Sequence, residues 1–240
     1  CTPLTLIYGP CEKILAYPQS DSYIRKYGKM IQQNTEKLNS LILELLEFRR
    51  LETGHKALSI QRLPVSDKLR NIAESFCELA ENKNLNYQLD IEPDIEWNTD
   101  ISCFNKIANN LISNAFKYTP EEGTINVSLK TENQHLTLSI SNSGKGIAKE
   151  NLLKIFDRYK ILDSFEMNGK NSRNGLGLAI CKSMTTLLNG EINVSSIQNE
   201  VTTFIVTLPE LSPSQQEADM SRKEYETTPI NTNTESIELE

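Results

Sequence analysis

Histidine, tryptophan and long apolar stretches are scarce in this 240-residue sequence. It has two histidines far apart and five cysteines without CxxC spacing, which argues against a zinc site. An odd number of cysteines favours a reducing, cytoplasmic setting. The cysteines are Cys1, Cys11, Cys77, Cys103 and Cys181. No apolar run reaches the length of a membrane span and no signal peptide opens the chain, so we expect any membrane anchor to lie outside it.

Negative charge is concentrated at the C-terminal end. The net charge is −7, and residues 210–240 contain eight acidic residues against Arg222 and Lys223. This segment therefore carries six of the seven net negative charges. The rest of the chain is nearly neutral, which argues against direct contact with nucleic acid. The Ser, Pro, Gln, Thr and Asn content of residues 210–240, together with their acidic residues, predicts that this segment forms an acidic disordered linker.

One stretch combines a polar and an apolar helical stripe. At about 100° per residue, Asn110, Asn114 and Lys117 fall on one face of a helix. Such a helix packs on a core and shows two amides and an ammonium group to a cleft. These groups suit a magnesium-bound triphosphate, because Mg²⁺ takes oxygen ligands and shares them with phosphates. A solvated polar face is the alternative. The apolar stripe consists of Phe104, Ile107, Ala108, Leu111 and Ala115.

Two glycine motifs follow this helix. The alternating strand pattern of residues 136–141 is broken by Asn142-Ser143-Gly144-Lys145-Gly146-Ile147, as expected where a backbone passes close to a ligand. Gly175-Leu176-Gly177-Leu178 opens an apolar-periodic helix, whose free N–H groups and dipole favour an anion. Taken separately, the first motif fits an ordinary glycine turn and the second is weak evidence. In this order and spacing, the three motifs reinforce one another.

Together the motifs resemble the N box, G1 box and G2 box of the sensor histidine kinases. The ATP-binding domain of that family is shared with DNA gyrase, the MutL mismatch-repair proteins and a class of heat-shock chaperones. Phe156 fits the F box between G1 and G2. The resemblance covers about residues 1–209. It implies an α+β fold, in which a helical hairpin that forms a four-helix bundle as a dimer precedes an α/β sandwich of the Bergerat, or GHKL, ATPase type.

The resemblance implies a site for ATP and Mg²⁺. Asn114 would be the magnesium ligand, Asn110 would support the triphosphate, and Lys117 would contact phosphate as the catalytic cation. Gly144 and Gly146 would let the backbone approach the base and ribose. The other implied nucleotide-binding residues are Tyr118, Asn142, Ile147, Phe156, Arg173, Gly175, Leu176, Gly177 and Leu178.

Two positions depart from the family pattern. Asn142 stands where the family commonly has Asp to accept the adenine amino proton. Asn keeps a carbonyl acceptor, and losing the charge-assisted bond weakens adenine binding by ~1 kcal/mol. Arg173-Asn174 replaces a Gly-Thr pair, which affects the lid more than nucleotide binding. That lid is the aperiodic segment of residues 160–172, which we expect to close over the triphosphate.

Residues 1–55 resemble the dimerisation and histidine phosphotransfer hairpin of the same family. A first helix is expected to start near Thr2-Pro3, and a second to run over residues 22–51, where Gly54 stops it. The apolar residues of the second helix recur at threes and fours, and two helices alone cannot cover that seam. We therefore expect a homodimer through residues 1–55. A monomeric hairpin packed on the next domain is the alternative.

The match at the N-terminus puts the phosphoacceptor outside this sequence. Cys1-Thr2-Pro3 aligns with the end of the family's His-Glu-x-x-Thr-Pro motif, so the acceptor histidine and its neighbouring glutamate would lie three and two positions before Cys1. Thr2 would help to position water for phosphatase activity on a receiver domain. His55 and His135 are interpreted as solvated loop residues and not as replacements for the acceptor.

Residues 56–209 are predicted to form the catalytic ATP-binding domain. The strands are expected to collect in one sheet with helices on one face. Ser66 or Asp67 is expected to cap the first helix, and Asp100 to begin the helix with the polar stripe. Strands are expected near residues 57–63, 85–91, 95–97, 124–130, 136–141, 192–196 and 203–208.

The implied reaction is phosphoryl transfer from ATP to a histidine nitrogen and then to an aspartate of a receiver domain. The chain would be the cytoplasmic kinase core of an inner-membrane sensor, of the hybrid two-component type. An ATP-hydrolysing clamp is one alternative, but such clamps place a water-activating Glu where Asn110 stands. A non-catalytic, nucleotide-binding dimer scaffold is another alternative. The replacement of the family's Asp by Asn142 is compatible with it.

Overall fold

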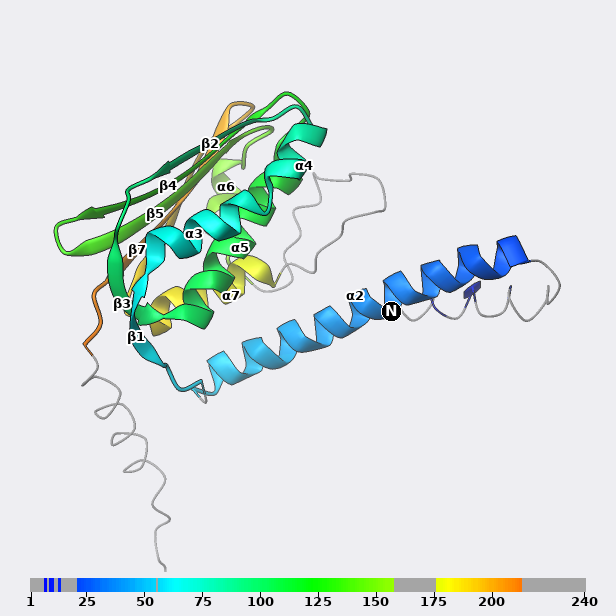
Figure 1. Ribbon diagram of the computed structural model, residues 1–240, viewed down its shortest axis with the longest axis horizontal. Helices are drawn as coiled ribbons and strands as arrows, with labels where there is room; N and C mark the ends of the chain where they lie inside the picture. The colour runs from blue at the N-terminus through cyan, green and yellow to red at the C-terminus, as the bar shows by residue number, and fades with distance from the viewer. Residues whose placement is uncertain are drawn as a thin grey trace, which may run out of the picture.

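A long helix and a layered domain make up the described part of the protein, known from a computed structural model (Figure 1). The structure describes residues 7, 9, 10, 13, 21–54, 56–157 and 176–212. Most of the first predicted helix, the predicted lid and the segment beyond residue 212 lie outside these residues. Among the described helices, none combines the length and the apolar composition that a membrane crossing requires.

Helix α2 (Asp21–Glu52) forms where the spacing of its apolar residues predicts it. It ends before Gly54, whose φ of 66° is readily adopted by glycine. The helix meets the domain near its C-terminal end, where Phe48 is buried among the core residues. At the same place, Glu47 Oε2 lies 3.0 Å from Lys106 Nζ.

A five-stranded sheet forms one layer of the domain, and helices cover one of its faces (Figure 1). The strand order is β2-β4-β5-β7-β6, and neighbouring strands are antiparallel except for the parallel pair β2 and β4. The strands are β2 (Asn86–Ile91), β4 (Thr124–Glu132), β5 (His135–Ser143), β6 (Glu191–Ile197) and β7 (Val201–Pro209). The helices are α3 (Val65–Glu74), α4 (Cys77–Asn82), α5 (Ile101–Tyr118), α6 (Lys149–Leu152) and α7 (Gly177–Leu187).

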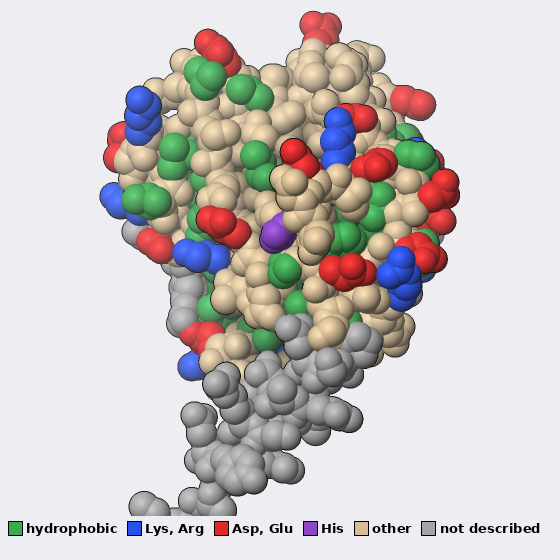
Figure 2. All heavy atoms as spheres, turned by 90° about the vertical axis from the view of Figure 1, so that its left-hand side faces the viewer, with side chains coloured by type: hydrophobic (Ala, Val, Ile, Leu, Met, Phe, Trp, Pro, Cys, Tyr) green, Lys and Arg blue, Asp and Glu red, His purple; other side chains and the backbone are tan. Residues whose placement is uncertain are grey.

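The alternating sequence of the strands separates a core face from a polar face. On β5, Leu136, Leu138 and Ile140 are almost completely buried beneath the helices, whereas the residues between them are polar and partly exposed. The same alternation continues on β7. Figure 2 views the molecule from the sheet side, where uncharged polar side chains and backbone predominate. The buried side of this sheet therefore supports the helices that carry the candidate site.

The expectation of a single sheet is wrong for two strands. Strand β1 (Ile60–Pro64) pairs antiparallel with β3 (Glu96–Asp100) in a separate two-stranded sheet. Trp97 on β3 is buried, and its Nε1 donates to Pro209 O at 3.3 Å. Leu211 is also buried, and its N–H donates to Asn98 O. The small sheet thus holds the chain where it enters the domain from α2 and where it leaves β7.

The expected cap of the first domain helix is also wrong. Helix α3 starts directly after Pro64, and no side chain caps it. Ser66 is buried instead, where its hydroxyl donates to Glu92 O at 2.6 Å and accepts from Ile95 N at 3.0 Å. Its hydroxyl therefore ties α3 to the connection between β2 and β3 and pairs with two backbone groups of that connection.

Helix α5 begins directly after Asp100, as predicted, and the Asp100 side chain caps it. The Asp100 carboxylate accepts from Cys103 N at 3.0 Å, from the Ser102 hydroxyl at 2.6 Å and from Ser59 N at 2.7 Å. Burial acts to raise the pKa of Asp100, but these hydrogen bonds outweigh it and hold the pKa below its ordinary value. One carboxylate therefore joins the start of α5 to the segment that leads from α2 into β1.

Replacing Asp100 by Ala should destabilise the domain by about 2 kcal/mol, because it leaves buried N–H groups without an acceptor. The lowered pKa means that the charged form is stabilised in the folded state. This contribution is complete above the unfolded-state pKa of about 3.9 and is lost as the pH falls through the folded-state pKa. Urea unfolding measured from neutral to acidic pH tests both points.

Asp90→Ala is the matched control, because Asp90 pairs with Lys130 in an exposed ion pair worth about 0–1 kcal/mol. Equal losses of unfolding free energy in Asp100→Ala and Asp90→Ala would contradict the capping role.

Candidate functional site

Helix α5 carries both predicted stripes on the expected faces. The residues of the apolar stripe are buried, at 3% exposure or less, against the sheet and the neighbouring helices. Asn110, Asn114 and Lys117 are half-buried on the polar stripe. Burial of the apolar stripe therefore fixes the rotation of α5 about its axis, and this rotation sets the direction of the polar stripe.

The polar stripe of α5 meets the start of α7. Asn110 Nδ2 donates to Gly177 O at 3.3 Å. A Cβ atom placed on Gly177 would lie 3.7 Å from the Asn110 side chain, so the two helices are in close contact at this point. The buried Leu176 precedes the contact. Asn114 lies one turn further along α5 on the same stripe, so the N-box amides and the G2 glycine share one region.

The end of α5 meets the turn that follows β5. Lys117 Nζ lies 4.9 Å from the centre of the Tyr118 ring. Gly144 has φ +152°, and a Cβ atom there would lie 2.7 Å from Tyr118 O. No larger residue fits between the two backbones without displacement. The G1 turn, which we define as residues 144–147, is therefore held against the last residues of the N box.

Asn142 occupies the end of β5 next to the G1 turn. It is 8% exposed and lies opposite Ile125 on β4 and Thr202 on β7. Its Nδ2 donates to Ser143 O at 3.0 Å. This bond uses the amide donor, so it does not consume the Oδ1 acceptor that recognition of an adenine amino group requires. The substitution of Asp by Asn at this position therefore preserves an acceptor, although an uncharged one.

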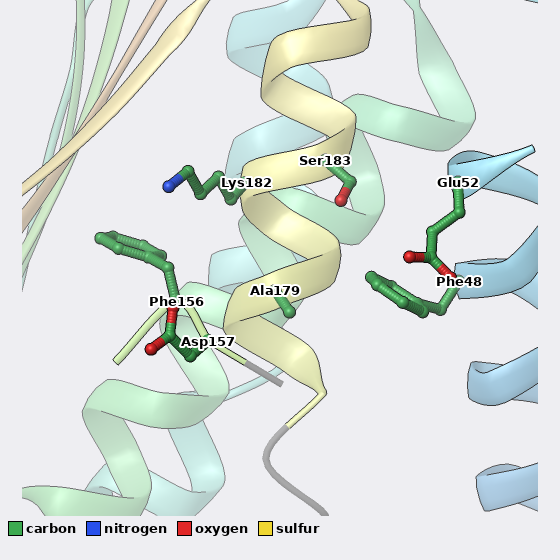
Figure 3. Close-up of a pocket in the computed structure, with 7 residues that line it drawn as sticks. All are labelled: Phe48, Glu52, Phe156, Asp157, Ala179, Lys182 and Ser183. Carbon is green, nitrogen blue, oxygen red and sulfur yellow. The ribbon is translucent and has the colours of Figure 1, made fainter. Parts of the chain in front are cut away.

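Phe156 lies in the turn after α6 and contacts α7 and β7. Its ring packs edge-on against Phe204, with centroids 6.4 Å apart, and Lys182 Nζ lies 5.7 Å from its centre. It is also one wall of a pocket of about 410 Å³ between α2 and the domain (Figure 3). The pocket is lined by Phe48, Glu52, Phe156, Asp157, Ala179, Lys182 and Ser183.

This pocket is distinct from the region that joins the motifs. On α7, Ala179, Lys182 and Ser183 face the pocket. Cys181 lies on the opposite side of α7, where its Sγ is 3.9 Å from Ile107 O of α5. Burial raises the pKa of Cys181 to about 12, so the thiol stays protonated at neutral pH and packs between the helices.

Several predicted residues lie outside the described part of the chain. They include Thr2, Arg173, Gly175, the lid and His55. His135 is described, and it is exposed beside the turn that joins β4 to β5. Residues of the N, G1 and G2 boxes meet in two contacts, one between Asn110 and Gly177 and one between Tyr118 and Gly144. Phe156 of the F box lies in the separate pocket.

Sequence reasoning missed two residues that support these contacts. Lys83 Nζ donates to Phe116 O at 2.8 Å, in the last turn of α5. Ser196 Oγ accepts from Ile147 N in the G1 turn at 2.9 Å. Neither residue stands in a motif, and each lies far in sequence from the group it contacts. No local pattern therefore signalled their role.

Comparison with known proteins identifies the family of this domain. Residues 99–212 match the model of the family of histidine kinase-, DNA gyrase B- and HSP90-like ATPases. Histidine kinase P4 of Formosa agariphila is 35% identical over 211 residues, which cover 87% of this chain. The chain spans 15% of the length of that relative.

Solved structures show the same fold. Full-length ShkA in complex with AMPPNP has a TM-score of 0.68 at 22% identity, over 80% of this chain and 40% of that one. Histidine kinase ThkA in complex with response regulator protein TrrA has a TM-score of 0.67 at 23% identity, over 87% of this chain and 58% of that one. The predicted α+β ATPase fold is thus confirmed. Residues 99–212 belong to the histidine kinase-, DNA gyrase B- and HSP90-like ATPases, in a chain whose homologues are sensor histidine kinases.

Proposed function

We propose that this chain is the cytoplasmic kinase core of a two-component sensor histidine kinase and binds Mg-ATP between α5, the G1 turn and the start of α7. The observation that carries the proposal is the contact of Asn110 with Gly177, which joins the N box to the G2 box. The full-length ShkA structure contains AMPPNP, which supports an adenine nucleotide as the ligand. Any membrane anchor would be supplied by segments outside this chain.

Each motif would hold a different part of the nucleotide. Tyr118, Asn142, Gly144, Gly146 and Ile147 would border the base and ribose. The triphosphate would lie along Asn110 and Lys117. It would also meet the free N–H groups at the start of α7, where Leu176, Gly177 and Leu178 lie. Phe156, Arg173 and Gly175 would complete the nucleotide-binding set.

Asn114 fits the role of the magnesium ligand. It is half-buried on the polar stripe, one turn from the amide that contacts α7, and it offers a neutral oxygen of the kind that Mg²⁺ accepts. When bound, Mg²⁺ would supply positive charge beside the phosphates. Lys117 would add a second cation at the same end of α5, so this chain's part in catalysis would be positioning and charge neutralisation.

The phosphoryl acceptor would be a histidine carried by the residues before Cys1. Transfer would break the bond between the γ-phosphorus and its bridging oxygen and form a bond to a histidine nitrogen. The phosphoryl group would then pass to an aspartate of a receiver domain, in the same longer chain or separate. The solved complex of ThkA with TrrA supports such a partner. Thr2 would assist the reverse, phosphatase reaction.

Two faces of α2 support a homodimer through residues 1–55. Glu47 and Phe48 contact the domain on one face of the helix. On the other face, Ile42, Leu45 and Leu46 are 41–53% exposed. An apolar stripe of this kind is unfavourable in water and is typical of a bundle seam. Docking of the ATP-binding domain therefore leaves the seam available to a second copy.

An ATP-hydrolysing clamp is less compatible with the site. Such a reaction needs a base at the position of Asn110, and a neutral amide has no suitable pKa. The Asn110 side chain also donates to Gly177 O, which makes it a tether between two helices.

Asn114→Ala should weaken Mg-ATP binding by about 10–100-fold, because loss of a hydrogen-bonding or ligating group on a charged ligand costs about 1.5–3 kcal/mol. Calorimetry with excess Mg²⁺ measures the change. With EDTA in place of Mg²⁺, the variant and the wild type should bind ATP equally. Asn109→Ala is the control, because Asn109 is exposed on the same helix and its amide bonds to Asn105 O. An equal loss in both variants would count against the magnesium role.

Extension of the chain upstream by its own preceding residues should allow it to phosphorylate itself. Labelled ATP should then yield a base-stable, acid-labile phosphoryl group, because phosphohistidine has these properties. Replacing the histidine three positions before Cys1 by Gln should abolish the label without changing Mg-ATP affinity. Steady ATP hydrolysis by the unextended chain, without any histidine partner, would support the clamp instead.

Ile42→Glu combined with Leu46→Glu should convert a dimer into a monomer, because two carboxylates cannot be buried unpaired in a bundle seam. Sedimentation velocity should show the mass change from twice 27.2 kDa to 27.2 kDa. Gln33→Glu is the control, because Gln33 is exposed on the opposite face of α2. A wild-type chain that stays monomeric at high concentration would refute dimerisation through this region.

A further inference from the structure

The G1 turn is fastened to the hairpin formed by β6 and β7. Gly144 N donates to Glu200 O at 3.1 Å, and Asn199 N donates to Lys145 O at 2.9 Å. A third bond runs from Ile147 N to Ser196 Oγ at 2.9 Å. Two of the three bonds join backbone to backbone, so Ser196 provides the side-chain link that a substitution removes.

The G1 turn and the turn between β6 and β7 pack so closely that no side chain fits at Gly146 without displacement. Gly146 has φ +68°, and a Cβ atom there would lie 2.7 Å from Ile197 O and 3.1 Å from Ser196 Oγ. On the hairpin side, Asn199 has φ 62°, a conformation that asparagine tolerates better than most residues. Close packing and the backbone hydrogen bonds between the two turns therefore restrict the conformation of each.

The Ser196 hydroxyl uses its full hydrogen-bonding capacity. It donates to Val201 O at 3.2 Å, accepts from Ile147 N, and lies 2.8 Å from Thr202 Oγ1, which can donate to its second lone pair. Such a hydroxyl cannot rotate without losing a bond. It therefore holds the N–H group of Ile147 in one direction.

Ser196 and Thr202 stand beside the two ends of the G1 motif. Ser196 binds Ile147 at the end of the motif. Thr202, its hydroxyl partner, lies directly opposite Asn142 at the beginning of the motif, in the pairing of β5 with β7. The strand that carries the partner of Ser196 therefore also pairs with Asn142 at the other end of the motif.

We propose that Ser196 is a positioning residue for the nucleoside part of the ligand. It holds the G1 turn in the conformation that lets the backbone at Gly144 and Gly146 approach the base and ribose. The inference rests on the proposed ATP site and deepens it. Without the bond to Ile147, the turn samples other conformations, and ordering it on binding reduces affinity. Ser196 acts through Ile147 and does not itself contact the nucleotide.

Ser196→Ala tests this role against Ser196→Thr, which keeps the hydroxyl. Ser195→Ala is the matched control, because Ser195 is the preceding residue of β6 and its exposed side chain lies on the other face of the sheet. We expect Ser196→Ala to bind Mg-ATP and adenosine about tenfold more weakly and inorganic tripolyphosphate with unchanged affinity. Ser196→Thr and Ser195→Ala should bind all three ligands like the wild type.

Hydrogen exchange in the ligand-free protein gives an independent readout. The amide of Ile147 should exchange at least about tenfold faster in Ser196→Ala than in the wild type or Ser195→Ala. An equal loss of affinity for adenosine and tripolyphosphate would mean that Ser196 merely stabilises the domain, which overturns the proposal. Unchanged adenosine affinity in Ser196→Ala would overturn it as well. A wild type that binds no Mg-ATP would instead refute the proposed function, and with it this role of Ser196.

Discussion

The rotation of α5 about its own axis is the constraint on which the rest of the site depends. Its apolar stripe is buried against the sheet and the other helices, and any rotation would expose Phe104 and Leu111 to water. The polar stripe must then face the start of α7, where Asn110 bonds to Gly177 O. Hydrophobic burial on one side of a helix thus sets the direction of the amides and the ammonium group on the other side.

Close backbone approach is the second feature of the site. Gly144 lies against Tyr118 O and Gly146 lies against Ile197 O, at distances that exclude a side chain. The backbone groups brought together in this way are paired with the hairpin of β6 and β7 through Glu200, Asn199 and Ser196. The glycines therefore allow the approach, and the hairpin determines which conformation they take.

Helix α2 and the layered domain meet close to this site. The ion pair of Glu47 with Lys106 connects α2 to α5, and Lys106 stands one helical turn before Asn110. Asp100 adds a second connection, because its carboxylate caps α5 and also accepts from Ser59 N, in the segment between α2 and β1. Helix α2 is therefore connected to the helix that carries the N-box amides, and it also packs against α7.

Local pattern was sufficient for the elements and for the motifs. The period of the apolar residues in α2 and α5, the alternation in β5, and the start of α5 at Asp100 depend on neighbours in sequence, and all appear in the structure where they were expected. Glycine spacing likewise identified Gly144, Gly146 and Gly177, because a conformational requirement of the backbone is a property of single residues. The binding roles of these residues remain predictions.

Tertiary structure alone decided which distant groups meet. The pairing of β1 with β3 outside the main sheet, the use of Ser66 as a buried bridge, and the contacts of Lys83 and Ser196 with the site all join segments far apart in sequence. Amino-acid patterns report the periodicity and conformational freedom of a segment, which are local quantities. The partner of a buried hydroxyl or ammonium group is chosen by the packing of whole elements, so it could be known only once the chain was folded.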